Sequence, residues 1–170
     1  MDWSRDGRSI LVRTSEGDLW SLTDGKPVRV TQTPFNETQP QFSPDSKWIA
    51  FVSYETKQPE VYVQAFPVGG ERFALSTAGG VQPRWRSDGS ELFYVALDGK
   101  LMSVAVKTAS GFEHSAPRPL FDVSYNDSFP NGFDYLVAQD GQRFLVRTPP
   151  KGSKPSPDRV ITNWLALAKK

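Results

Sequence analysis

The 170-residue chain carries 20 Lys and Arg against 19 Asp and Glu, which gives a formal net charge of +1. This balance offers no electrostatic argument for a nucleic-acid or anionic-membrane partner. Zero cysteines exclude disulfides, thiolate catalysis and cysteine metal sites. No apolar run is as long as a membrane helix, which needs about 18 residues. The opening MDWSRDGRSI has no apolar signal-peptide core.

One turn pattern recurs along the chain. Its four copies are DWSRDGRSILV from Asp2, QFSPDSKWIAF from Gln41, RWRSDGSELFY from Arg84 and LVAQDGQRFLV from Leu136. The turn aspartates of the four copies are Asp6, Asp45, Asp88 and Asp140, separated by 39, 43 and 52 positions. Self-similarity at this period indicates a repeat architecture.

Each repeat is predicted to contain short strands. The Asp and the small residue after it suit a hairpin turn, because Asp bonds nearby backbone and Gly adopts a left-handed conformation at low cost. After the turns come SILVRT, WIAFVS, ELFYVAL and RFLVRT, rich in β-branched and aromatic residues. Third strands are expected at 18–22, 60–66 and 100–106, and fourth strands at 27–32, 72–77 and 118–124.

Four antiparallel strands in about 42 residues are the content of one β-propeller blade. The sequence therefore predicts an all-β fold with about four blades, at about 1–33, 34–78, 79–125 and 126–170, as part of a larger ring. A β-sandwich is the alternative, but it does not require the same turn at every fourth strand. A helical repeat is disfavoured by 14 prolines and 13 glycines spread through the chain.

The repeats resemble the TolB-type, WD40-like propeller repeat (PD40). The residues that carry this resemblance are Pro40, Phe42, Ser43, Pro44, Asp45, Ile49, Phe51, Val61, Tyr62, Val63, Gly69 and Gly70, with a second copy at Pro83, Trp85, Asp88, Gly89, Leu92 and Phe93. The second copy departs by having Arg86-Ser87 for Ser-Pro. The segments QDGQRFLVRTPP and ITNWLALAKK, the second with the pair Asn163-Trp164, resemble the end of the propellers at the C-terminus of bacterial membrane-anchored Ser/Thr kinases. No kinase motif is present.

The resemblance implies a non-catalytic module that binds a protein, peptide or small ligand, as the sensory or scaffolding part of a bacterial signalling protein. It favours a periplasmic or extracytoplasmic location. The alternative is a propeller associated with a hydrolase of the prolyl-oligopeptidase or lactonase type. We expect no cofactor, no metal, no nucleic-acid partner and no direct membrane insertion.

The candidate binding surface is the propeller face formed by the loops that join blades and the loops between second and third strands. Its candidate ligand-binding side chains are Asn36, Gln39, Lys57, Gln82, Tyr125, Asn126, Asp127 and Asn131. Gln39 and Gln82 each precede a Pro and are expected to point their amides at the axial channel. Ordinary solvated loops are the alternative interpretation.

Other conspicuous residues have structural interpretations. His114 is the single histidine and no G-x-S-x-G motif occurs, so we expect an exposed, non-catalytic side chain. The repeated aspartates are expected to cap turns and not to bind calcium. The five tryptophans, Trp3, Trp20, Trp48, Trp85 and Trp164, are expected in the core between blades and not in a stacking platform.

The ring is expected to be incomplete, because propellers of this type usually have six or more blades. Exposed end blades would favour association, and a homodimer of two half-rings would complete a propeller. The competing outcome is a compact four-bladed ring, in which the segment before Trp3 pairs with VITNWLALA.

Overall fold

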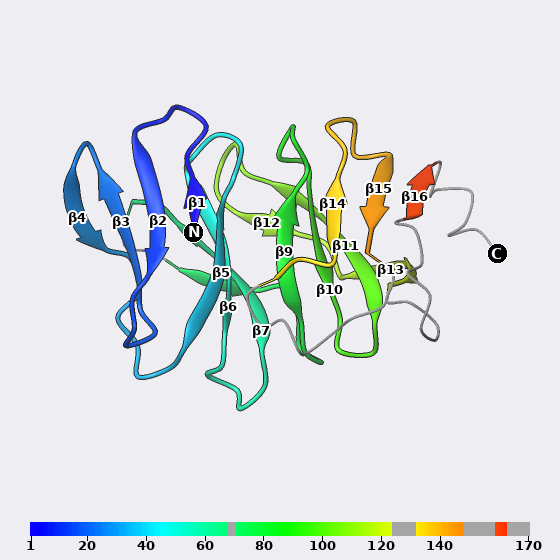
Figure 1. Ribbon diagram of the computed structural model, residues 1–170, viewed down its shortest axis with the longest axis horizontal. Helices are drawn as coiled ribbons and strands as arrows, with labels where there is room; N and C mark the ends of the chain where they lie inside the picture. The colour runs from blue at the N-terminus through cyan, green and yellow to red at the C-terminus, as the bar shows by residue number, and fades with distance from the viewer. Residues whose placement is uncertain (68–70, 124–131, 148–158, 163–170) are drawn as a thin grey trace.

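A computed structural model describes residues 1–67, 71–123 and 132–147, and residues 159–162 as backbone only. These residues form strands and turns without a helix, in four antiparallel sheets, which confirms the all-β prediction (Figure 1). Sheet 1 contains β1 (Asp2–Trp3), β2 (Ser9–Arg13), β3 (Leu19–Thr23) and β4 (Lys26–Arg29). Sheet 2 contains β5 (Glu37–Phe42), β6 (Trp48–Ser53), β7 (Glu60–Ala65) and β8 (Arg72–Ala74).

Sheets 3 and 4 follow in chain order. Sheet 3 contains β9 (Val81–Trp85), β10 (Glu91–Val95), β11 (Lys100–Lys107), β12 (Glu113–His114) and β13 (Arg118–Asp122), of which β12 and β13 both pair with β11. Sheet 4 contains β14 (Tyr135–Val137), β15 (Arg143–Val146) and β16 (Arg159–Thr162). Within each sheet, strands next to each other in the chain pair as an antiparallel meander, apart from the split edge formed by β12 and β13.

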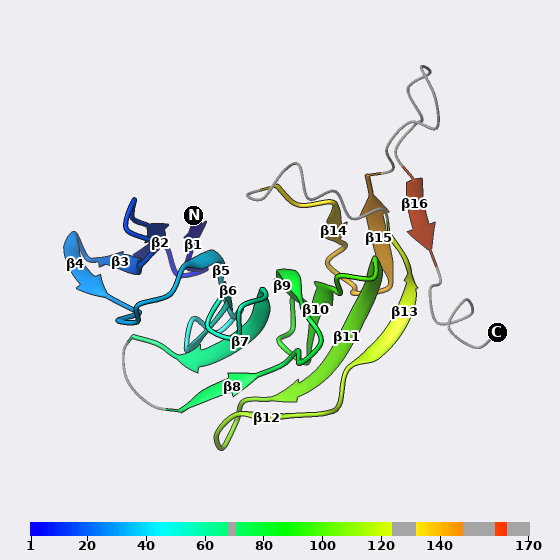
Figure 2. The same ribbon diagram turned by 90° about the horizontal axis from the view of Figure 1, so that it is seen from below.

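The sheets stand side by side in an open arc. Figure 2 shows β1, β5, β9 and β14 along its concave side, with sheets 1 and 4 at the two ends. Two of these inner strands carry a β-bulge, between Thr38 and Gln41 in β5 and opposite Phe93 and Val95 in β9. At the bulges Gln39 and Gln82 have φ of 53° and 59°, a left-handed conformation that bends the inner strand.

The core lies between neighbouring sheets. Between sheets 1 and 2 the buried side chains are Leu11, Leu19, Val30, Phe42, Ile49, Phe51 and Tyr62. A larger cluster runs from Ala50 and Val52 of sheet 2 through Leu92 and Phe93 of sheet 3 to Phe144 of sheet 4. Because both faces of a middle sheet are covered, strands such as β6 and β10 carry apolar side chains on both faces. Burial of each large apolar side chain stabilises the fold by about 2 kcal/mol.

The edge of sheet 3 differs from the expected single fourth strand. The segment before β13 forms the extra strand β12, whose His114 pairs with Val106. The turn between them places Phe112 against Trp48, Phe73 and Trp85, with ring centroids 5.1, 4.9 and 6.5 Å away. Phe112 is 7% exposed, so the additional hairpin covers the outer end of the contact between sheets 2 and 3.

Candidate functional site

The four repeated turns follow the first strand of each sheet, and hydrogen bonds hold each one. The Asp45 carboxylate accepts from the Ser43 hydroxyl at 2.5 Å and from the Lys47 N–H at 3.1 Å. The Ser43 hydroxyl oxygen in turn accepts from the Trp48 N–H at 3.0 Å, and the Ser46 N–H bonds the Ser43 carbonyl. The turn-capping prediction is confirmed, because every turn aspartate accepts from the N–H two residues later.

In three of the turns the bonds favour the charged form of the aspartate. The Ser4 hydroxyl and the Arg8 N–H lower the pKa of Asp6. Two bonds from Ser90 lower the pKa of Asp88. The pKa of Asp140 is lowered in the same way, first by the Gln142 N–H. Each of these turns therefore presents a carboxylate at neutral pH.

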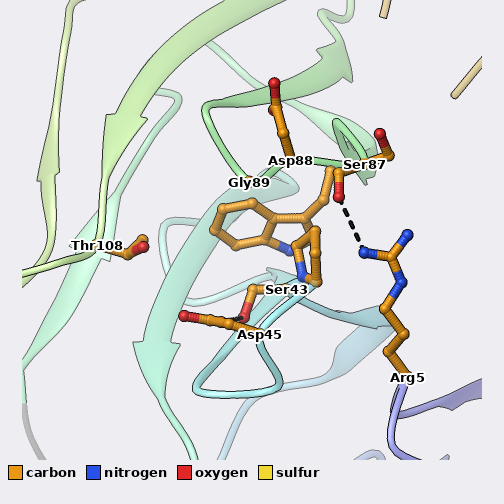
Figure 3. Close-up of a pocket in the computed structure, with 9 residues that line it drawn as sticks. Arg5, Ser43, Asp45, Ser87, Asp88, Gly89 and Thr108 are labelled. Carbon is orange, nitrogen blue, oxygen red and sulfur yellow. Dashed lines mark hydrogen bonds between the residues drawn. The ribbon is translucent and has the colours of Figure 1, made fainter. Parts of the chain in front are cut away.

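Three of the turns enclose a pocket of about 280 Å³ (Figure 3). Its lining consists of Arg5, Ser43, Pro44, Asp45, Trp85, Ser87, Asp88, Gly89 and Thr108. Sheets 1, 2 and 3 each contribute a turn, and Thr108 comes from the loop between β11 and β12. The sequence predicts Asp45 and Asp88 only as separate turn caps, because nothing in it shows that turns of different sheets lie side by side.

The pocket combines both charges with an aromatic wall. The Arg5 guanidinium donates to the Ser87 carbonyl at 3.1 Å, which fixes the cation at the junction of two turns. Asp88 also lies 3.2 Å from the Arg86 guanidinium. Trp85 is 7% exposed, and its indole nitrogen has no hydrogen-bond partner among the described residues. A ligand in this pocket would meet two carboxylates, one guanidinium and the edge of an indole.

The loop face predicted from the sequence is assembled in part. The Arg13 guanidinium donates to the Asn36 side-chain oxygen at 2.9 Å, and the Asn36 carbonyl accepts from the Tyr54 N–H. The Tyr54 carbonyl accepts from the N–H of Lys57, whose φ is 71°. Asn36 and Lys57 are both exposed and belong to adjoining loops. Tyr125, Asn126, Asp127 and Asn131 lie outside the described residues.

Gln39 and Gln82 are placed differently from the expectation. Gln82 is 1% exposed: its amide nitrogen donates to the Asp134 carboxylate at 2.9 Å, and its amide oxygen accepts from the Asp134 N–H at 2.8 Å. The Gln82 N–H donates to the Gln39 side-chain oxygen at 2.6 Å, and its carbonyl accepts from the Tyr135 hydroxyl. The Gln82 amide therefore joins sheet 3 to sheet 4 instead of pointing into an open channel, because the left-handed backbone turns the side chain toward the neighbouring strand.

The half-buried Arg84 near the inner strands is a charged group that was not predicted from the sequence. The Arg84 guanidinium carbon lies 3.6 Å from the centroid of the Phe133 ring, a cation–π contact. Burial lowers the pKa of Arg84 and raises that of Asp2, and the two groups attract each other. The Asp2 carboxylate accepts from the Phe42 N–H at 2.7 Å. These side chains link inner strands, and the alternation of β9 was the only sequence signal for Arg84.

His114 is exposed on the edge strand β12, and its ring nitrogen Nδ1 lies 3.1 Å from the Ser115 carbonyl oxygen. Within the described ranges, no group of three or more His, Cys, Asp or Glu side chains is arranged to hold a metal ion. The same part of the chain has no helix with the length and hydropathy needed to cross a membrane.

Sequence comparison finds one distant relative. No protein-family model matches the chain. An uncharacterized protein of Agrobacterium fabrum is 29% identical over 102 residues, which cover 56% of this chain and 35% of that protein. The chain therefore spans about a third of the length of the curated relative it matches.

Structural similarity is broader. TolB from Acinetobacter baumannii matches with a TM-score of 0.64 and 17% identity, over 88% of this chain and 37% of that one. Tricorn protease matches with a TM-score of 0.66 and 16% identity, over 89% and 19%. The β-propeller domain of Cps50 (Swd1) from Myceliophteria thermophila matches with 0.54 and 14%, over 97% and 58%.

The chain has a TolB-like, WD40-like β-propeller fold. The partial coverage of each neighbour agrees with the open arc of four sheets, which corresponds to part of a propeller (Figure 2). Identities of 14–17% establish the fold and do not carry the neighbours' activities to this chain. The resemblance to kinase-linked propellers stays a prediction, since its Asn163-Trp164 motif lies outside the described residues.

Proposed function

We propose that this chain is a non-catalytic β-propeller module that binds a peptide, a protein or a small ligand. The observation that carries the proposal is the pocket of about 280 Å³ between the turns of three sheets. Its volume suits one or two side chains of a partner or a small fragment, because pockets for drug-sized ligands measure about 300–1,000 Å³ and this pocket lies just below that range. Its polar groups come from turns that are held by hydrogen bonds, so they are positioned before a ligand arrives.

The electrostatics of the pocket favour a ligand that carries groups of both charges. Asp45 and Asp88 contribute two carboxylates, and the hydrogen bonds from Ser90 keep Asp88 ionised. The Arg5 guanidinium lies across the pocket from Asp45 and donates to the Ser87 carbonyl. A Lys or Arg side chain next to an acidic or carbonyl group would satisfy both sets, as in a peptide of mixed charge.

The loop face is a second proposed contact surface. The bonds from Arg13 to Asn36 and from Tyr54 to Asn36 join the loops of sheets 1 and 2. Asn36 and Lys57 are exposed there and available to a partner. Larger partners of propellers contact several loops at once, so this surface would add specificity to the pocket or act independently.

The biological setting is also a proposal. The resemblance of the repeats to TolB-type propellers, and of the end of the chain to kinase-linked propellers, supports a sensory or scaffolding role in bacterial signalling, in an extracytoplasmic compartment. The hydrolase alternative gains a propeller neighbour in tricorn protease, but at 16% identity this concerns the fold. If any esterase or peptidase activity were found, His114→Ala should leave it unchanged. Loss of that activity in the variant would contradict the non-catalytic function.

The test is a screen of the full chain against a mixed-charge peptide library and a fragment library, followed by NMR chemical shifts. Binding at the pocket predicts shifts at Trp85 and Thr108, and at least tenfold weaker affinity in Asp88→Asn. Asp140→Asn is the matched control, because Asp140 caps the equivalent turn of sheet 4 but does not line the pocket. Equal effects of both substitutions would reject the pocket.

The loop face is tested in the same screen with Lys57→Ala. If the partner uses this face, Lys57→Ala weakens binding while Asp88→Asn leaves it unchanged. If no library member binds the full chain at millimolar concentration, the proposed binding function is wrong. It is also wrong if a member binds but neither Asp88→Asn nor Lys57→Ala weakens its binding.

A further inference from the structure

Sheet 1 has one uncovered apolar face. In its antiparallel register Trp3 pairs with Ile10, Ile10 with Leu22, and Val12 with Trp20, so these side chains share one face. Trp3 is 63% exposed and Leu22 is 40% exposed. The opposite face of the sheet carries Leu11 and Leu19, which are fully buried against sheet 2. No described residue of another sheet covers the Trp3 face.

The repeat shows what such a face packs against. Counted from the turn aspartate, Trp3 is equivalent to Phe42 in sheet 2 and to Trp85 in sheet 3. Phe42 and Trp85 are 5% and 7% exposed, because the preceding sheet covers them. Ile10 is likewise equivalent to Ile49 and Leu92, which are both fully buried. The Trp3 face is therefore the face that receives a preceding sheet, and it is the apolar surface of a blade-to-blade contact.

Sheet 4 exposes the complementary face. Leu145 occupies the position of Leu11, Ala50 and Phe93, whose side chains are all fully buried against the following sheet. In sheet 4 the same position is 39% exposed. Leu136, its cross-strand partner, is 53% exposed. This Leu145 face is the surface with which a sheet covers the next one.

The two faces cannot meet within the arc, since sheets 1 and 4 lie at its opposite ends (Figure 2). Inside the molecule, however, this same pair of faces is in contact wherever one sheet follows another. Leu11 and Leu19 of sheet 1 cover Phe42 and Ile49 of sheet 2. The net charge of +1 does not oppose the approach of two copies.

We propose that the Leu145 face of one copy packs on the Trp3 face of a second copy. The contact continues the internal sheet-to-sheet packing across the two molecules. Two such contacts, related by a twofold axis, join the arcs into one closed ring. This interaction is independent of the ligand pocket, because neither face contains a residue that lines the pocket.

The first measurement is the mass of the full chain by light scattering after size exclusion, over a range of concentrations. The expected result is twice the chain mass of 19.0 kDa. Trp3→Lys and Leu145→Asp should each raise the dimer dissociation constant about 100-fold, since each buries a charge in an apolar contact. Leu97→Asp is the control: Leu97 is also 39% exposed, but it lies in the loop between β10 and β11. Circular dichroism establishes that each variant is folded.

Mixing the two variants tests the arrangement itself. In a mixed dimer, one junction pairs the new lysine with the new aspartate, while the other junction carries both natural faces. A mixture of Trp3→Lys and Leu145→Asp should therefore recover the dimer, although each variant alone stays monomeric. The proposal would be overturned if the natural chain were monomeric or if its mass grew without limit as the concentration rises. It would also be overturned if Leu97→Asp weakened the dimer as much as the two face variants do, or if the mixture did not recover the dimer.

Discussion

Gln82→Leu is the substitution that most directly tests how the sheets are joined. Leucine keeps nearly the same volume but removes both amide bonds to Asp134. The Asp134 N–H and one carboxylate oxygen then each lose the hydrogen bond with Gln82, at a site where Asp134 is 2% exposed. A buried hydrogen bond lost from one side costs about 1–3 kcal/mol, so we expect the free energy of unfolding to fall by about 3 kcal/mol. Arg147 remains bound to Asp134 and limits the loss.

The assay is urea unfolding followed by tryptophan fluorescence. With a slope of about 1–3 kcal/mol per molar urea, the midpoint should fall by about 1–3 M. Gln32→Leu makes the same chemical change at an exposed position and should stay within about 0.5 kcal/mol of the natural chain. If Gln82→Leu were equally neutral, the inter-sheet network would contribute nothing to stability. If stability were unchanged but ligand binding disappeared, the Gln82 amide would serve the ligand as the sequence had suggested.

Three further predictions concern the turns. Asp45→Ala should lower the free energy of unfolding by about 1 kcal/mol, as other lost caps do, which calorimetry would measure; no change would contradict the capping role. Gly17→Ala should cost about 1 kcal/mol more than Gly25→Ala in urea unfolding: both glycines have positive φ, but only at Gly17 would a Cβ lie 2.2 Å from the Asn36 oxygen. Equal losses would contradict this. Because hydrogen bonds lower the folded-state pKa of Asp6, Asp88 and Asp140, their stabilisation is complete above the ordinary value of 3.8 and is lost as pH falls through the lower folded values. Unfolding free energies at pH 7, 5 and 3 should therefore decrease mainly below pH 5, and an increase toward pH 3 would refute the assignment.

The strands and turns could be predicted because their causes are local. The Asp45 turn closes with bonds among Ser43, Lys47 and Trp48, all within a few residues. The apolar run after the turn follows from burial on both faces of β6. The extra strand β12 was missed because Phe112 is buried by Trp48 and Trp85, which belong to other strands and cannot be found from the local pattern.

The candidate sites were harder to predict because their partners are distant in the chain. Gln82 meets Asp134 across 52 residues, and Gln39 across 43. A glutamine before a proline on an inner strand gives no indication of whether its amide finds a protein partner or a ligand. The pocket has the same character: Arg5 reaches Ser87 across 82 residues, so its charge arrangement exists only in the folded arc.

The tryptophans show why repeat position and burial must be separated. The pattern places Trp3 and Trp85 at equivalent positions and predicts both in the core between blades. For Trp3 this prediction is wrong. Trp85 is 7% exposed and Trp3 is 63% exposed. The difference is caused by the neighbouring sheet: sheet 2 covers Trp85, and no described residue does the same for Trp3. A repeat sequence specifies which face each sheet offers, whereas the burial of that face depends on whether another sheet is placed against it.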